Sequence, residues 1–216
     1  MNIAESNVAK QGERRAMVRL LAAIMLGMMT IGSVGSARAA PVRYVFDPAH
    51  SFLGIAWQHF GFSTSYGKFA KFDGELLLDE KKPEDSKLTV TVAIDSLQVS
   101  TEGFRKHLLG ADFFDAKKYP TATFVSRKIT LTSDQSAEVQ GDLTIHGVTK
   151  PATLAVRLNK LAVHPMRKVK AAGFDARAMV KRSQFGMGAF TPMVSDDVGI
   201  FISTELYRAD SGPEQR

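Results

Sequence analysis

Cysteine is absent from the 216-residue sequence. This absence excludes disulfide bonds, thiolate catalysis and cysteine-ligated metal sites, so the folded chain must take its stability from a packed core. The sequence also lacks a G-x-S-x-G nucleophile elbow and a glycine-rich loop of the kind that cradles phosphate. It therefore carries neither of these local signatures of hydrolases and nucleotide-binding enzymes.

A long hydrophobic run is lacking as well. The apolar stretch over residues 20–34 falls short of the roughly 18–20 residues that span a bilayer. It follows a basic segment and precedes an A-x-A site at Ala37 and Ala39, and these are the parts of a secretory signal. We therefore predict a signal peptide over residues 1–39, cleaved after Ala39, and an exported protein with no membrane span after processing. An uncleaved anchor is the alternative, and Arg14-Arg15 leaves twin-arginine export open beside ordinary secretion.

An excess of charge of one sign is also lacking outside this segment. Residues 1–39 hold five basic and two acidic residues, so the formal net charge of the remaining chain falls from +6 to +3. So small a charge gives no basic footprint for nucleic acid. The remaining length is sufficient for one domain with its own core, which we predict over residues 40–208, followed by a flexible tail over 209–216.

The chain does contain many segments in which apolar and polar residues alternate, which is the pattern of half-buried strands. The pattern is clear over residues 88–94, 137–147, 152–158 and 199–207, and weaker over 44–47, 52–59, 71–79, 121–131 and 173–181. Turn-like connections separate these segments, and the basic segment 164–173 is interpreted as a solvated hairpin. Many strands with few helices indicate an all-β fold, either an antiparallel barrel or a sandwich. A count of about eight strands favours the closed barrel, which pairs its own edges.

One segment, residues 100–114, is predicted to be helical at its start. Ser100-Thr101 is a plausible N-cap, Phe104, His107 and Leu108 share one face, and Gly110 can end the helix. We predict that this short helix caps one end of the barrel. Phe113 and Phe114, which follow it, are expected to pack at the same end, with at least one ring in the core.

Candidate catalytic and metal-binding groups are few. The five histidines show no metal-ligand spacing, so we predict no metal site, although His50 and His59 flank one strand and could converge in space. The segment DPAHS (47–51) brings together Asp47, His50 and Ser51 in sequence. On an extended chain these side chains would point in different directions and could not form a relay. No catalytic residue is predicted.

Several blocks of the sequence resemble motifs of the YceI-like family. They are DPAHS, HFGFSTSYGKFAKFDGEL, STEGFRKHLLGADFFDAKKYPTATF, GDLTIHGVTKPATL and the late RSQFGMG and SDDVGI, in family order over about residues 43–206. The resemblance implies a lipocalin-like barrel, exported to the periplasm of Gram-negative bacteria, that binds a polyprenyl lipid, an isoprenoid quinone or a similar amphipathic lipid. It implies no settled enzymatic activity and no cofactor beyond such a lipid. Some members are linked to stress responses or to isoprenoid-quinone electron transport.

A barrel that holds such a lipid needs an apolar lining and a polar rim. The apolar lining and cap are expected to include Trp57, Phe60, Phe62, Phe69, Phe104, Leu108, Phe113, Phe114, Phe124 and Phe185. The polar rim is expected to include His59, Arg105, His107 and Arg182, although ion pairs that pin a helix or strand are an equal reading of the two arginines.

Two other functions stay open at this point. The protein could be an enzyme that acts on such a lipid, with His50 or His59 as acid or base, or a stress-related interaction module with a filled core and no ligand. Histidine beside a carboxylate inside a cavity would favour the enzyme. An apolar tube with polar groups only at its rim would favour the carrier.

Overall fold

A computed structural model of the protein describes residues 40–209. The predicted signal peptide, residues 1–39, and residues 210–216 of the predicted tail lie outside the described residues. The strands are β1 Val42–Phe46, β2 Phe52–His59, β3 Ser63–Phe69, β4 Phe72–Leu78, β5 Lys87–Ala93, β6 Leu97–Gln98, β7 Thr121–Ser133, β8 Ser136–Ile145, β9 Val148–Val163, β10 Lys170–Lys181 and β11 Val194–Arg208. The helix α2 spans Glu102–Leu108, and short 3₁₀ turns are η1 Pro48–His50, η2 Pro83–Asp85, η3 Ile94–Ser96 and η4 Arg182–Phe185.

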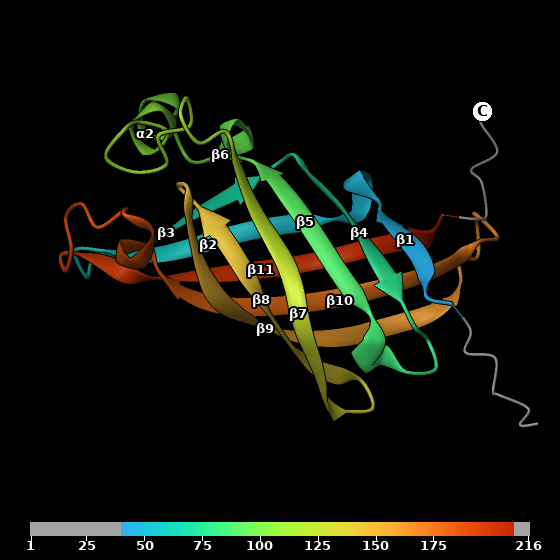
Figure 1. The fold of residues 1–216 in the computed structure, drawn as a ribbon. Coiled ribbons are helices and arrows are strands. Elements are labelled where there is room, and N and C mark those ends of the chain that lie inside the picture. Colours follow the sequence, from blue (N-terminus) through green and yellow to red (C-terminus); the bar gives the residue numbers. More distant parts are fainter. Residues whose placement is uncertain (1–39, 210–216) are drawn as a thin grey trace, which may run out of the picture. The chain divides into compact units, whose positions relative to one another are not determined.

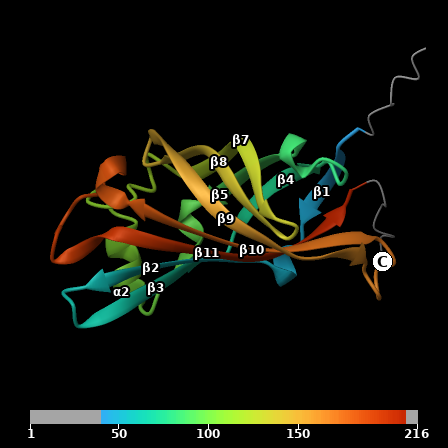
Figure 2. The same cartoon turned by 90° about the horizontal axis from the view of Figure 1, so that it is seen from below.

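Eight of these strands close into an antiparallel barrel (Figure 1), in the order β1-β4-β5-β7-β8-β9-β10-β11 with β11 paired back to β1. Strand β11 is long enough to serve two neighbours. Its C-terminal part pairs with β1, as in Phe46 opposite Leu206, and its middle pairs with β2, as in Leu53 opposite Ile202. Strands β2, β3 and β6 therefore extend the sheet beyond the closed wall, as Figure 2 shows for β2 and β3. The predicted all-β barrel of about eight strands is confirmed.

The predicted alternation corresponds to the inner and outer faces of the barrel. Leu88, Val90 and Val92 of β5 line the interior, whereas Thr89 and Thr91 between them are exposed. Buried side chains form three clusters, one of them around Phe124, Val139 and Leu154. The second cluster surrounds Trp57, Leu97 and Leu108, and the third surrounds Tyr44 and Leu206.

The predicted helix is confirmed as α2, beside β6 at one end of the barrel (Figure 1). It begins after Thr101, whose hydroxyl accepts a hydrogen bond from the Phe104 N–H at 3.2 Å, as expected of an N-cap. Leu108 is its buried residue. The prediction for the two rings is also confirmed, because Phe113 is buried in the core and Phe114 packs against the same cluster. Within residues 40–209, no helix has both the length and the apolarity needed to cross a bilayer.

The predicted hairpin over 164–173 is present as the turn between β9 and β10. His164 stabilises it, because its Nδ1 accepts hydrogen bonds from the N–H groups of Met166 and Arg167 at 3.3 and 3.1 Å. The hairpin is not simply solvated. Arg167 lies over the ring of Tyr207, with its guanidinium carbon 4.3 Å from the ring centroid.

Candidate functional site: an apolar cavity in the barrel

The interior of the barrel contains a cavity of about 460 Å³, a volume within the range of sites for small molecules. Inward-facing side chains from all eight barrel strands contribute to its wall, and most wall residues are aliphatic or aromatic. At one end the wall includes Trp57 and Phe113, beside α2. At the other it includes Asp134 and Gln135 of the β7–β8 turn, which are exposed, so the cavity reaches the surface there.

Polar groups are sparse in this wall. Five of them, Glu80, Ser86, Asp134, Gln135 and Ser136, lie near the β4–β5 connection and the β7–β8 turn, and the others are Thr123, Arg182 and Thr204. Among residues 40–209, no histidine contributes to the wall of this larger cavity. The long middle section is therefore an apolar tube, which suits an apolar chain rather than a charged molecule.

A smaller cavity of about 320 Å³ adjoins the larger one at the α2 end. The two share Trp57, Leu108, Phe113 and Val194 as wall residues, so they lie on either side of the same side chains. The other wall residues of the smaller cavity are His59, Phe60, Phe104, His107 and Phe190. Its rings touch one another: the centroids of Phe113 and Phe190 are 6.2 Å apart, and those of Trp57 and Phe104 are 6.1 Å apart.

The structure brings most of the expected apolar residues to these cavities. Those that line the larger cavity are Trp57, Phe69, Leu108, Phe113, Phe114, Phe124 and Phe185. Phe60 and Phe104 line the smaller one. Phe62 lines neither and is almost fully exposed. Whether any of these residues contacts a ligand stays a prediction.

The expected polar rim divides into two histidines and two arginines. His59 and His107 line the smaller cavity. Arg105 lines neither cavity; its guanidinium donates hydrogen bonds to the main-chain oxygens of Leu97 and Asp95 and pairs with Glu102. This arginine therefore fixes α2 to the chain around β6, which is the pinning role that the sequence left open.

Arg182 is buried in the wall of the larger cavity, and its hydrogen bonds go to main-chain oxygens. The guanidinium donates to Ser195 at 2.9 Å, Ala189 at 2.8 Å and Val194 at 2.9 Å, and also to Met187. Burial lowers the pKa of this guanidinium. The arginine thus organises the loop that leads into β11, through carbonyls rather than through the ion pair considered from the sequence.

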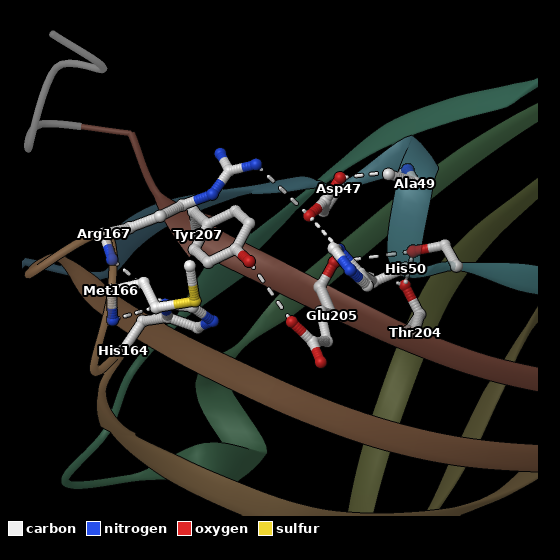
Figure 3. Close-up of polar contacts among 10 residues, drawn as sticks. Asp47, Ala49, His50, His164, Met166, Arg167, Thr204, Glu205 and Tyr207 are labelled. Atoms are coloured by element: carbon white, nitrogen blue, oxygen red, sulfur yellow. Dashed lines mark hydrogen bonds and ion pairs between the residues drawn. The ribbon is translucent and has the colours of Figure 1, made fainter.

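The segment DPAHS differs from its predicted geometry. Pro48 opens the 3₁₀ turn η1, and this turn brings the ring of His50 to Asp47, with Nδ1 2.7 Å from Oδ2 (Figure 3). The prediction that these side chains point apart was therefore wrong for Asp47 and His50, because it assumed an extended chain. Ser51 does not join them. Its Oγ lies 2.6 Å from the hydroxyl of Thr204, so the three residues form no relay.

Asp47 is the centre of a polar cluster on the outside of the cavity (Figure 3). Its buried carboxylate also accepts a hydrogen bond from the Ala49 N–H at 3.0 Å and lies 3.5 Å from Nη2 of Arg167. Burial acts to raise the pKa of Asp47, but these hydrogen bonds and the positive charge outweigh it and the pKa is lowered. Near the same carboxylate, burial raises the pKa of Tyr207 to about 12.

The ligand atoms of Asp47, His50 and Glu205 lie within 4.8 Å of one another. Glu205 accepts a hydrogen bond from the hydroxyl of Tyr207 at 3.2 Å. The carboxylate of Asp47 already has His50 and Arg167 as partners, so the cluster acts as a polar clamp between η1 and the β9–β10 turn.

Sequence reasoning missed several wall residues. Phe46, Phe72 and Phe174 line the larger cavity, and Phe190 lines the smaller one. Phe46, Phe72 and Phe174 occupy predicted strands, so assigning each strand's inner face would have found them. Phe190 lies in residues 183–195, whose sequence signal is the complete lack of Asp, Glu, Lys and Arg.

Several known proteins are similar to this chain in sequence, in fold or in both. Protein YceI of Escherichia coli O157:H7 is 38% identical over 173 residues, covering 80% of this chain and 90% of that protein. The crystal structure of BcnA from Burkholderia cenocepacia aligns with a TM-score of 0.68 and 27% identity, over 74% of this chain and 98% of that one. A polyisoprenoid-binding domain from Saccharophagus degradans shares the fold alone, with a TM-score of 0.59 and 12% identity over 78% and 99% of the two chains. The family model described as YceI-like domain matches residues 44–206, and this protein belongs to that family.

Proposed function

We propose that this protein is a periplasmic binding protein that holds a polyprenyl lipid, an isoprenoid quinone or a similar amphipathic lipid inside its barrel. The observation that carries the proposal is the apolar cavity of about 460 Å³, which runs from the α2 end to the β7–β8 turn. The polyisoprenoid-binding description of the Saccharophagus degradans domain, which has the same fold, supports this choice of ligand class.

The energetics favour a long apolar chain. Each buried CH₂ group contributes about 0.8 kcal/mol, so a five-carbon isoprene unit contributes up to roughly 4 kcal/mol. Ordering the chain and losing its free motion offset much of this gain. A chain that contacts the apolar wall over its whole length can still bind tightly, whereas a compact polar molecule would lose its hydration without finding partners.

The head group is expected to meet His59 and His107 in the smaller cavity, since Arg105 and Arg182 donate their hydrogen bonds to main-chain oxygens. Replacing both histidines with leucine should change the head-group preference without lowering the amount of lipid bound. Competition between a prenyl alcohol and a prenyl diphosphate of equal chain length measures this preference. An unchanged preference between the two ligands would show that His59 and His107 do not contact the head group.

A plugged barrel tests the proposal directly. Ala176 of β10 lines the cavity, so Ala176→Phe should place a ring in the space that the lipid needs. Ala155 of β9 is exposed and lies opposite Arg177, so Ala155→Phe makes the same change outside. Native mass spectrometry of protein taken from its host should detect lipid in the wild type and in Ala155→Phe, and little in Ala176→Phe. Equal lipid in all three proteins, or none in the wild type, would contradict the proposal.

Export is the second part of the proposal and has its own test. Cell fractionation should recover the protein from the periplasm, and N-terminal sequencing should read from Ala40. A chain that begins at Met1 and stays with the cytoplasm would contradict export while leaving lipid binding intact.

A further inference from the structure

Two neighbouring loops beside the smaller cavity expose apolar side chains. We call them the mouth loops: residues 60–62, between β2 and β3, and residues 186–193, between η4 and β11. The exposed fractions are 45% for Phe60, 91% for Phe62, 51% for Phe190 and 58% for Met193. Contiguous exposed apolar side chains of this kind mark surfaces that bind proteins or membranes.

Main-chain hydrogen bonds connect the two mouth loops to each other, and Arg182 fixes the second loop from the inside. The Phe60 N–H donates to the Met193 carbonyl at 2.9 Å, and Val194 pairs with His59 in the register of β11 and β2. Arg182 donates to the carbonyls of Ala189 and Val194 from inside. The exposed rings are therefore carried by a hydrogen-bonded backbone. Both Phe60 and Phe190 have positive φ angles, of 52° and 62°, a costly conformation for bulky residues and one that gathers at functional sites.

The two loops and their flanks carry no formal charge. Residues 54–67 and 183–195 contain no Asp, Glu, Lys or Arg, although charged residues make up 23% of the whole chain. A protein partner that docked through ion pairs would find none here. A bilayer interface, in contrast, accepts aromatic and aliphatic side chains among its head groups without needing charge.

The mouth loops also lie next to the cavities of the barrel. Phe60 and Phe190 line the smaller cavity, which shares Trp57 and Phe113 with the larger one. We propose that the mouth loops insert into the surface of a phospholipid bilayer, where the isoprenoid cargo is dissolved, and place the smaller cavity against it. This inference rests on the proposed lipid-carrier function and adds where the cargo enters.

The side chains that would insert into the bilayer are apolar, so binding of the protein to vesicles should need no anionic lipid and should not weaken as the salt concentration rises. For this test the protein is isolated from its host in the form that the cell accumulates, and its N-terminus is determined. A flotation assay then measures its binding to phosphatidylcholine vesicles, prepared with and without phosphatidylglycerol. The wild type should float equally with both vesicles at low and high salt. Phe62→Ser/Met193→Ser should lower the partition coefficient at least about tenfold, because two apolar side chains no longer leave water.

The matched control is Phe52→Ser/Met166→Ser, which makes the same two changes at side chains that are 47% and 85% exposed and lie outside the mouth loops. It should float like the wild type. Thermal unfolding confirms that both double variants are folded. Equal losses in the two variants would overturn the proposal, as would flotation that requires phosphatidylglycerol and disappears in salt. A mouth-loop variant that changes the oligomer mass but still floats would show that the patch covers a second copy of the chain.

Binding of geranylgeraniol, followed through the single tryptophan, Trp57, separates this inference from the function on which it rests. All three proteins should bind this probe alike, since the mutated side chains line neither cavity. Normal probe binding without flotation of the wild type would overturn membrane docking alone. Failure of the wild type to bind the probe would overturn the carrier function as well.

Discussion

Asp47 connects parts of the chain that are far apart in sequence, because its one carboxylate meets both His50 of η1 and Arg167 of the β9–β10 turn. A buried carboxylate without partners would be costly, but here each oxygen has a donor. The hydrogen bond to Asp47 raises the pKa of His50, while the pKa of Asp47 is lowered. The two shifts describe one interaction from its two sides.

Asp47→Asn should lower the free energy of unfolding by about 1–3 kcal/mol at neutral pH, since it removes a charged partner from hydrogen bonds made at a buried site. It should also return the pKa of His50 toward its ordinary value. Urea denaturation measures the first effect and an NMR titration of the histidine ring the second. Asp73→Asn, at an exposed position of β4, is the control. Equal effects of the two substitutions would contradict a stabilising role for the polar clamp around Asp47.

The contribution of this clamp should depend on pH at both ends of its range. The lowered pKa of Asp47 means that its stabilisation is present above its unfolded pKa and is lost as the pH falls through the folded value. The raised pKa of His50 means that its stabilisation is present below its unfolded pKa and is lost as the pH rises through the folded value. The stability difference between wild type and Asp47→Asn should therefore shrink on strong acidification and above the folded pKa of His50. A difference that is constant with pH would contradict this account.

Gly141 of β8 allows a close approach between neighbouring strands. A Cβ at this position would lie 2.5 Å from both the ring of Phe124 and the carbonyl oxygen of Val125. Gly141→Ala should therefore destabilise the protein by about 1–3 kcal/mol, as overpacking does. Gly103→Ala is the control, because a Cβ at this position has no atom within 4 Å. Gly103 lies in α2, and in a helix alanine is favoured over glycine by about 0.5–1 kcal/mol. Chemical denaturation should move the two variants in opposite directions.

At the scale of elements, the sequence predicted the strands whose own side chains alternate and missed those that do not. Strand β11 was predicted, because Ile200, Ile202 and Leu206 recur at every second or fourth position and all line the cavity. Strand β3, with the sequence STSYGKF, was not predicted as a strand. Its residues pair with β2 along its whole length, so the neighbour, rather than its own alternation, defines it.

The same distinction explains the candidate site. Of the expected lining residues, Trp57 and Phe124 lie on predicted strands and do line the larger cavity, since the face of a strand is a local property. The partners of Arg105, Arg182 and Asp47 are not local: they are carbonyls and charges brought close by loops and turns. No periodicity in the sequence carries that information.

The attachment of α2 gives a prediction at this scale. Arg105 holds the helix to the main chain around β6 through the oxygens of Leu97 and Asp95. Arg105→Gln removes these bonds, so local opening of α2 should become easier and its amide protons should exchange at least several-fold faster, while the barrel strands keep their protection. Lys106→Gln, at an exposed position of the same helix, should leave exchange unchanged. Faster exchange throughout the barrel would mean that Arg105 supports the whole fold rather than the cap.

For the whole molecule, the decisive property is that the barrel closes around more space than its side chains fill. Alanines contribute to this, since Ala122, Ala152, Ala176 and Ala178 all line the larger cavity. They come from β7, β9 and β10, and their faces meet only once the barrel is closed. The sequence could therefore predict a barrel, but it could not distinguish a hollow interior from a filled one.

The finite length of this hollow predicts how affinity depends on the ligand. In a series of prenyl alcohols with increasing numbers of isoprene units, each added unit should tighten binding as long as it enters the apolar tube, by no more than about 4 kcal/mol and in practice by less. The gain should stop once the chain extends past Asp134 and Gln135 into water, because further units bury no new surface. Titration of Trp57 fluorescence measures the series. Ala176→Phe should bring the plateau to shorter chains, and Ala155→Phe should leave it in place. Affinity that is independent of chain length would show that the ligand does not lie along the tube.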